Sequence, residues 1–164
     1  MATIEKFETR IDLPAGTREK ITALLNRQLA DTFDLYSQTK QAHWNVKGEE
    51  FFQLHQLYDT LAAELLEDID LIAERVTALG GTALGTIHMA AQASRLPEYA
   101  PEVIESLSSI EVLAVRYASL VETTRNAIDT ATDEGDLSTA DLLTQISRGL
   151  DKALWFLEAH LQQK

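Results

Sequence analysis

The chain has 164 residues, 45% of them hydrophobic, and no cysteine. This predicts one globular domain with a proper core and excludes disulfides, thiolate metal sites, iron–sulfur clusters and a cysteine nucleophile. A formal net charge of −12 repels nucleic acid and anionic membranes and attracts cations, although solubility alone is the simpler explanation. Neither a signal peptide nor a stretch long enough to cross a bilayer is visible, so we expect a cytoplasmic protein without a membrane partner.

The first half of the chain predicts an irregular arm and two long helices. Residues 1–16 lack helical periodicity and end in a Pro/Gly turn, so we expect an arm ahead of a domain spanning 17–164. Apolar spacings of three and four predict a first helix over 17–44, closed by a turn at 45–48. A second helix of about 29 residues is predicted from 49 to a Gly-Gly pair at 80. The expected inward residues are Ile21, Leu24, Leu25, Leu29, Phe33 and Tyr36, then Phe52, Leu54, Leu57, Leu61, Leu65, Ile69, Ile72 and Val76.

The middle of the chain predicts a crossover followed by a third long helix. Residues 82–107 are too many for a tight turn and suit a crossover with a short helix around 86–93. Ser108 and Glu111 fit a capping box, so the third long helix is expected to begin there and to end near Ala131.

The last segment completes the predicted fold. After a loop at 132–139, a fourth long helix is expected over about 140–161. Four long helices with one long connection describe an all-α, ferritin-like four-helix bundle. Its expected inward residues are Leu142, Ile146, Leu150, Leu154 and Leu157.

Two pairs of candidate metal ligands lie on the second helix. His55 and Asp59 are four residues apart, as are Asp70 and Glu74, so each pair projects from one face of the helix. A pair at this spacing is more often an ordinary solvated surface pair than a metal site. The same spacing recurs in Glu64 and Asp68.

A second copy of the helix would bring the two pairs together. Their midpoints are fifteen residues apart, roughly 22 Å along a helix, and a net rotation of roughly 60° leaves them facing the same side. If two copies pack antiparallel across a two-fold axis, His55 and Asp59 of one meet Asp70 and Glu74 of the other, and this happens twice. The turn after the first helix brings His43 toward the same place.

Imidazoles and carboxylates would suit Fe²⁺, Mn²⁺ or Zn²⁺, and carboxylates favour Fe³⁺ over Fe²⁺ once iron is bound. A self-contained di-iron subunit should show Glu-x-x-His motifs, and the sequence contains none. This moves any iron chemistry toward a site shared between chains.

Several motifs resemble those of the Dps family of mini-ferritins. They are KQAHWNVKG from Lys40, the H-x-x-x-D that follows, DxxxERxxxLGGxALGT from Asp70 to Thr86, and TADLLTQISRGLDKALWFLE from Thr139 to Glu158. The resemblance covers nearly the whole chain after the arm. It implies a hollow homododecamer of a bacterial cytoplasm that oxidises Fe²⁺, preferentially with hydrogen peroxide and otherwise with oxygen, stores ferric mineral and so protects DNA.

Carried over by position, the resemblance implies that the ferroxidase ligands are His43, His55 and Asp59 of one subunit with Asp70 and Glu74 of its neighbour. Zinc or manganese would be competing ions. Trp44 matches a tryptophan that the family keeps beside the site, and its alternative role is that of a core anchor.

The family admits iron through acidic pores at three-fold axes, formed near the end of the third long helix and the following loop. The alternative for these residues is a solvated loop with a helix N-cap. The candidates are Asp129, Asp133, Glu134, Asp136 and Asp141. His88 and His160 lie outside the ligand set, and we expect structural or solvated roles for them.

The sequence leaves two other functions open. One is a DNA-compacting protein of the nucleoid with secondary iron chemistry. We expect weak or no DNA binding, because Lys6 and Arg10 of the arm are offset by acidic residues and the C-terminus offers only Lys164. The other is a helical oligomer without iron oxidation, which the complete ligand set argues against.

Overall fold

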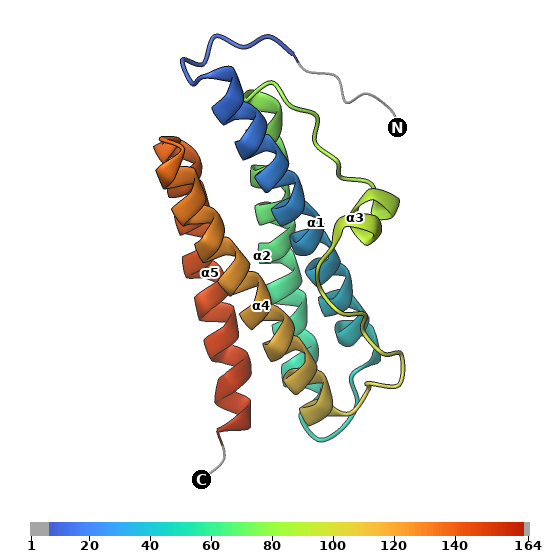
Figure 1. Ribbon diagram of the computed structural model, residues 1–164. Coiled ribbons are helices and arrows are strands. Elements are labelled where there is room, and N and C mark those ends of the chain that lie inside the picture. The colour runs from blue at the N-terminus through green and yellow to red at the C-terminus, as the bar shows by residue number, and fades with distance from the viewer. Residues whose placement is uncertain (1–6, 163–164) are drawn as a thin grey trace.

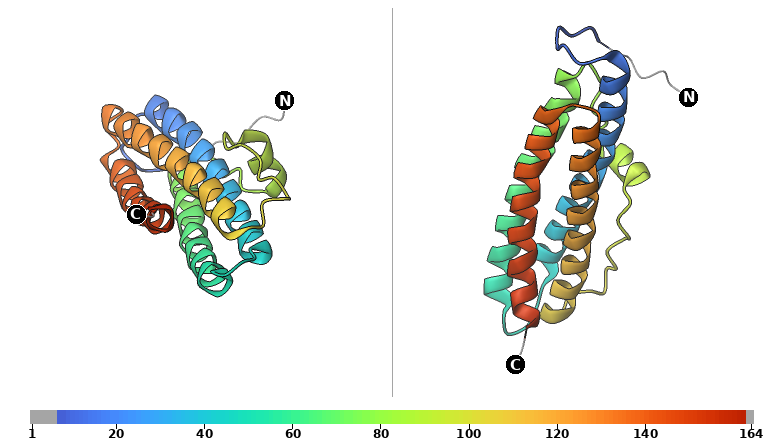
Figure 2. Two further views of the ribbon diagram at one scale, coloured as in Figure 1. Left: turned by 90° about the horizontal axis from the view of Figure 1, so that it is seen from below. Right: turned by 60° about the vertical axis from the view of Figure 1, so that its left-hand side comes forward.

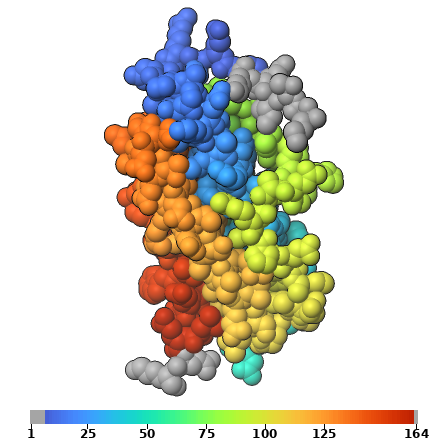
Figure 3. Space-filling model, viewed as in Figure 1, coloured from blue at the N-terminus to red at the C-terminus, as the bar shows by residue number. Residues whose placement is uncertain are grey.

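The computed structural model describes residues 7–162 and folds them into four long helices with a short helix outside them (Figure 1, Figure 2). The segment between α2 and α4 carries α3 and crosses the outer face of α1, which Figure 3 shows as a yellow-green band beside the blue helix. This confirms the predicted all-α bundle with its long crossover. The helices are α1 (Ala15–Asn45), α2 (Phe51–Ala78), α3 (Ile87–Ala93), α4 (Ser106–Asp133) and α5 (Leu137–Leu161). None of them, in the part of the chain that is described, is long and apolar enough to span a membrane.

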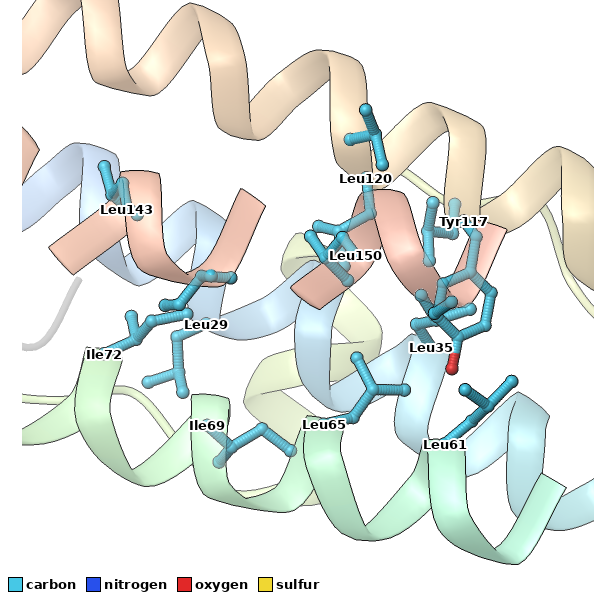
Figure 4. Close-up of a cluster of buried hydrophobic side chains, with 14 of the residues drawn as sticks. Leu29, Leu35, Leu61, Leu65, Ile69, Ile72, Tyr117, Leu120, Leu143 and Leu150 are labelled. Carbon is cyan, nitrogen blue, oxygen red and sulfur yellow. The ribbon is translucent and has the colours of Figure 1, made fainter. Parts of the chain in front are cut away.

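The core lies where the apolar faces of α1, α2, α4 and α5 meet (Figure 4). The predicted inward residues are buried or partly buried with one exception, Phe52, which is 67% exposed. Leu54 is fully buried, and a residue two positions away lies roughly 200° around the helix, so Phe52 faces outward. The pattern missed two fully enclosed aromatic residues, Tyr58 of α2 and Tyr117 of α4.

A set of polar contacts, here called the crossover seam, fixes the crossover to α1. Asp31 is 1% exposed, and its two carboxylate oxygens accept from the backbone N–H and the guanidinium of Arg95 at 2.7 and 2.8 Å. One turn along, Asp34 accepts from the Ser94 hydroxyl. The seam therefore satisfies buried polar groups within the chain and sets the position of α3. It consists of Asp31, Asp34 and Gln38 of α1 with Ser94, Arg95 and the Pro97 carbonyl.

The predicted N-cap of the third long helix is wrong by three residues. Its N-cap is Glu105, whose carboxylate accepts from the backbone N–H groups of Ser108 and Leu107 at 2.9 and 3.1 Å. These hydrogen bonds hold the pKa of Glu105 below its usual range, and the one from Ser108 has the largest effect. The predicted capping box of Ser108 and Glu111 is not used, because the carboxylate at 105 already satisfies the free N–H groups.

The last helix also begins earlier than predicted, at Leu137 rather than near 140. Asp136 is its N-cap and accepts from the backbone N–H of Thr139 at 3.0 Å, so the first turn is already helical. At the other end of the bundle, α1 begins at Ala15 with Pro14 as its N-cap, two residues before the predicted start. The predicted short helix at 86–93 and the stop of α2 before the Gly-Gly pair are confirmed.

The described part of the arm, residues 7–14, is irregular and packs on its own subunit. The backbone N–H of Phe7 donates to the carbonyl of Gly80 at 2.9 Å, and Ile11 and Leu13 pack against the core. Gly80 has φ +84°, and a Cβ there would collide with the Phe7 carbonyl, so glycine is required for this contact. Three of the terminal charged residues on which the expected weak DNA binding depends lie outside the described residues: Glu5, Lys6 and Lys164.

Candidate metal centre

The short turn between α1 and α2 brings two distant histidines together. The backbone N–H of Val46 donates to Ala42 and closes α1, and Gly48 then reverses the chain with φ +129°. The Ser106 hydroxyl donates to the Lys47 carbonyl at 2.9 Å and ties this turn to α4. Because α2 must then run back along α1, the last turn of one helix lies beside the first turn of the other.

His43 and His55 face each other across this pair of helices. Their rings are stacked with centroids 3.9 Å apart and an interplanar angle of 17°. Nδ1 of His43 donates to the carbonyl of His55 at 2.8 Å, and Nδ1 of His55 donates to the carbonyl of His43 at 2.9 Å. Since a carbonyl oxygen only accepts, both Nδ1 atoms carry the proton in the neutral rings, and both Nε2 atoms keep a lone pair. The predicted approach of His43 to His55 is confirmed.

Asp59 adds a carboxylate to the two imidazoles. It lies one turn beyond His55 on α2, with Oδ1 3.8 Å from Nε2 of His43 and a side chain that is 59% exposed. The Lys40 ammonium donates to the same oxygen at 2.7 Å. This hydrogen bond, together with the positive charge of Lys40, lowers the pKa of Asp59. We call His43, His55 and Asp59 the metal half-site.

The other two predicted ligands lie far along the same helix. Asp70 and Glu74 are exposed near the C-terminal end of α2, and Asp70 is eleven residues beyond Asp59, roughly 16 Å along the helix axis. Among the described residues, no group of three or more potential ligands of one chain is close enough to hold a metal ion. The chain thus presents the five predicted ligands as two separate sets.

Arg75, next to Glu74, fixes this end of α2. Its Nη2 donates to Asp136 at 2.7 Å and its Nε donates to the Thr139 hydroxyl at 2.8 Å. Asp136 is 2% exposed, so this predicted pore residue stabilises the start of α5. Glu134 pairs with the Lys20 ammonium at 2.7 Å. The remaining pore candidates are exposed: Asp129, Asp133 and Asp141.

Trp44 is 67% exposed and does not anchor the core of the subunit. Its ring lies 5.7 Å from the ammonium of Lys40, so it belongs to the surroundings of the metal half-site. His88 is exposed, and His160 donates from Nδ1 to the carbonyl of Phe156 within α5. The sequence prediction missed Lys40, although its position three residues before His43 places it on the same face of α1.

The family model of the ferritin-like domain matches residues 22–164. The DNA protection during starvation protein of Agrobacterium fabrum is 43% identical over 161 residues, which are 98% of this chain and 99% of that protein.

Solved structures give the same result. DpsC from Streptomyces coelicolor superposes with a TM-score of 0.92 at 34% identity, covering 99% of this chain and 94% of that one. The Dps protein from Vibrio cholerae O1, described as a member of a broad superfamily of ferritin-like diiron-carboxylate proteins, superposes with a TM-score of 0.89 at 27% identity, over 99% of this chain and all of that one.

Proposed function

Because the chain belongs to the Dps family of ferritin-like proteins, we propose that it oxidises Fe²⁺, preferentially with hydrogen peroxide, and stores the ferric product inside a dodecameric shell. The observation that carries this proposal is the mutual hydrogen bonding of His43 and His55, which leaves both Nε2 atoms free as metal ligands beside Asp59. Such hydrogen bonds on Nδ1 are the usual way in which proteins orient a metal-binding imidazole.

The complete site combines two subunits. His43, His55 and Asp59 come from one subunit, and Asp70 and Glu74 come from its two-fold partner. The separation of these sets along α2 supports this arrangement, because an antiparallel partner helix superimposes the beginning of one α2 on the end of the other. Each two-fold contact then makes two equivalent sites.

The donor atoms suit iron as the substrate. Nitrogen and oxygen ligands bind Fe²⁺, Mn²⁺ and Zn²⁺, so manganese and zinc are expected to compete. Three carboxylates around the ion favour Fe³⁺ and ease the loss of an electron. The hydrogen bond and positive charge of Lys40 lower the pKa of Asp59 and so favour its carboxylate form, the form that binds a cation.

The reaction removes both reagents of hydroxyl-radical formation. Two ferrous ions give one electron each to one peroxide molecule, and two protons complete its conversion to two water molecules. In the cytoplasm such a protein would protect DNA without touching it. Exposed Asp129, Asp133 and Asp141 at the α4–α5 end are our candidates for the cation entry path.

Direct DNA binding is the second candidate, and we expect it to be weak. The arm residues 7–14 hold one basic residue, Arg10, and are attached to the bundle through the hydrogen bond from Phe7 to Gly80. A formal net charge of −12 repels phosphate, whereas DNA binding requires several phosphate contacts from cations.

The test is anaerobic loading of the purified oligomer with a few Fe²⁺ per subunit, followed by stopped-flow absorbance after peroxide or, separately, oxygen is added. We expect oxidation much faster with peroxide than with oxygen. Equal or faster oxidation with oxygen would make the protein mainly an iron store. A rate no higher than that of free iron would contradict the proposal.

A further inference from the structure

The beginning of α4 lies against the turn that joins α1 to α2. The backbone N–H of Lys47 donates to the carbonyl of Ile104 at 2.8 Å, and the hydroxyl of Ser106 donates to the carbonyl of Lys47 at 2.9 Å. Ser106 is 1% exposed. A Cβ at Gly48 would lie only 2.6 Å from the Ser106 hydroxyl oxygen, so the close approach of the turn to α4 requires glycine. Both backbone polar groups of Lys47 are therefore held by the start of α4.

Two further hydrogen bonds join the start of α4 to α2. The Ser109 hydroxyl donates to the carbonyl of Ser106 at 2.8 Å, and the hydroxyl oxygen of Tyr58 lies 2.8 Å from Oγ of Ser109. Because a serine hydroxyl carries one proton and that of Ser109 is already donated, Tyr58 is the donor in the second bond. Tyr58 and Ser109 are both 0% exposed. We call Ser106, Ser109 and Tyr58 the α4 clamp, since their hydrogen bonds run from α2 through α4 to the turn.

The α4 clamp acts on the segments that carry the two imidazoles of the half-site. Lys47 is four residues after His43, and Tyr58 is three residues after His55. Each imidazole donates to the carbonyl of the other residue, so the pair requires one particular offset between the end of α1 and the start of α2. Hydrogen bonds hold only over a narrow range of distance and angle. The clamp fixes this offset, because it binds the turn on one side and α2 on the other.

We propose that Ser106, Ser109 and Tyr58 are positioning residues that hold His43 and His55 in their metal-binding arrangement. This inference rests on the proposed function, since it presumes that a metal ion binds at the half-site. The three hydroxyls act through the turn and through α2, and they are not ligands. Groups that orient metal ligands directly change metal affinity by about 10- to 100-fold. Because the clamp acts one step further away, we expect an effect of roughly ten-fold, at the lower end of this range.

The experiment is anaerobic titration of the assembled protein with Co²⁺, which takes similar ligands and whose visible absorption reports the geometry of its ligands. Ser106→Ala combined with Tyr58→Phe removes a hydroxyl at each end of the clamp, and Tyr58→Phe alone is the milder variant. The matched control is Tyr117→Phe with Ser147→Ala, which makes the same two chemical changes at buried positions of α4 and α5. The Tyr117 hydroxyl lies 3.5 Å from that of Thr39 and not at the turn. Light scattering checks assembly, and urea denaturation measures stability.

We expect the double clamp variant to bind Co²⁺ roughly ten-fold more weakly than wild type and with an altered visible spectrum, and Tyr58→Phe to show a smaller loss in the same direction. The control pair should keep the wild-type affinity and spectrum, whatever its loss of stability. Wild-type affinity and spectrum in both clamp variants, or in Tyr58→Phe where the double variant does not assemble, would overturn the clamp and leave the proposed function intact. An equal loss in the control pair would also overturn it, because a general loosening of the bundle would then explain the effect. Absence of Co²⁺ binding from wild type would overturn the shared site and this inference together.

Discussion

Acidic side chains are buried or half-buried in the crossover seam and exposed in the proposed metal half-site. In the seam, Asp31 is 1% exposed and both of its oxygens accept hydrogen bonds from Arg95. In the half-site, the side chain of Asp59 is 59% exposed, and Asp70 and Glu74 of the complementary set are exposed as well. A buried carboxylate whose two oxygens both accept from its own chain stabilises the subunit. Asp59 is paired with Lys40 through one oxygen but stays largely exposed beside ordered imidazoles, which suits the proposed role of a metal ligand.

The largest expected effect comes from the exposed set. Asp70→Asn combined with Glu74→Gln removes two carboxylate charges and keeps the side-chain volumes. We expect stopped-flow iron oxidation to fall by at least roughly 100-fold while light scattering shows unchanged assembly. The control is Glu64→Gln with Glu67→Gln, two exposed acids of the same helix between the ligand pairs. Fast oxidation in the ligand variant, or an equal loss in the control, would mean that the ligands are misassigned.

The seam should show the reverse pattern. Asp31→Asn leaves the guanidinium of Arg95 without its buried charged partner, and we expect the free energy of unfolding to fall by about 3 kcal/mol. Oxidation by the protein that remains assembled should not change, because Asp31 is remote from the half-site in sequence and contacts the crossover instead. Urea denaturation and stopped-flow rates on the same samples measure the two effects. A loss of oxidation without a loss of stability would show that the two regions are not separable.

Asp68 lies between the two cases, since it is half-buried and its neighbours are acidic. Burial, followed by the charges of Glu64 and Glu67, raises its pKa to about 7. The folded state therefore favours the protonated acid, so ionised Asp68 costs stability above the folded pKa. Below about pH 4 the acid is protonated in folded and unfolded chains alike, and the cost disappears.

We therefore expect Asp68→Asn to raise the free energy of unfolding by about 2 kcal/mol near pH 8, after a discount for its partial exposure, and to change little near pH 4. Urea denaturation across this range measures the difference from wild type. Glu122→Gln, at an exposed position of α4, is the control. A gain that is the same at both ends of the range would show that the ionisation of Asp68 is not its cause.

The sequence predicted the helices well, because a regular apolar spacing leaves one face that must be buried. It failed at the starts of α4 and α5, where a single carboxylate determines which residue is the N-cap. Glu105 and Asp136 cap α4 and α5 before the predicted positions, and no spacing rule shows which of several nearby polar residues will fold back onto the free N–H groups. The exposure of Phe52 follows from its angle on α2, which the spacing of its neighbours could have shown.

The candidate site shows the same division. The spacing of four residues predicted that His55 and Asp59 share one face of α2, and the short loop predicted that His43 lies near His55. Both predictions follow from helix geometry. The exchange of hydrogen bonds between each imidazole and the other residue's carbonyl could not be predicted, because it depends on side-chain angles and on the offset of two helices. The five ligands as one site stay a prediction until a second copy is observed.

The smallest effect should come from an exposed ion pair within the bundle. Nη2 of Arg125 on α4 donates to both oxygens of Asp151 on α5 at 2.8 and 2.9 Å, with side chains 57% and 44% exposed. We expect Asp151→Asn to cost about 0.5 kcal/mol in urea denaturation at low salt and less than that at about 1 M sodium chloride, because water and salt screen exposed charges. Its distances are close to those of the Asp31–Arg95 pair, and Asp31 is buried whereas the Asp151 side chain is exposed. If Asp151→Asn were as costly as Asp31→Asn, burial would not determine how much such a pair contributes to stability. Exposure would then no longer distinguish structural carboxylates from the proposed metal ligands.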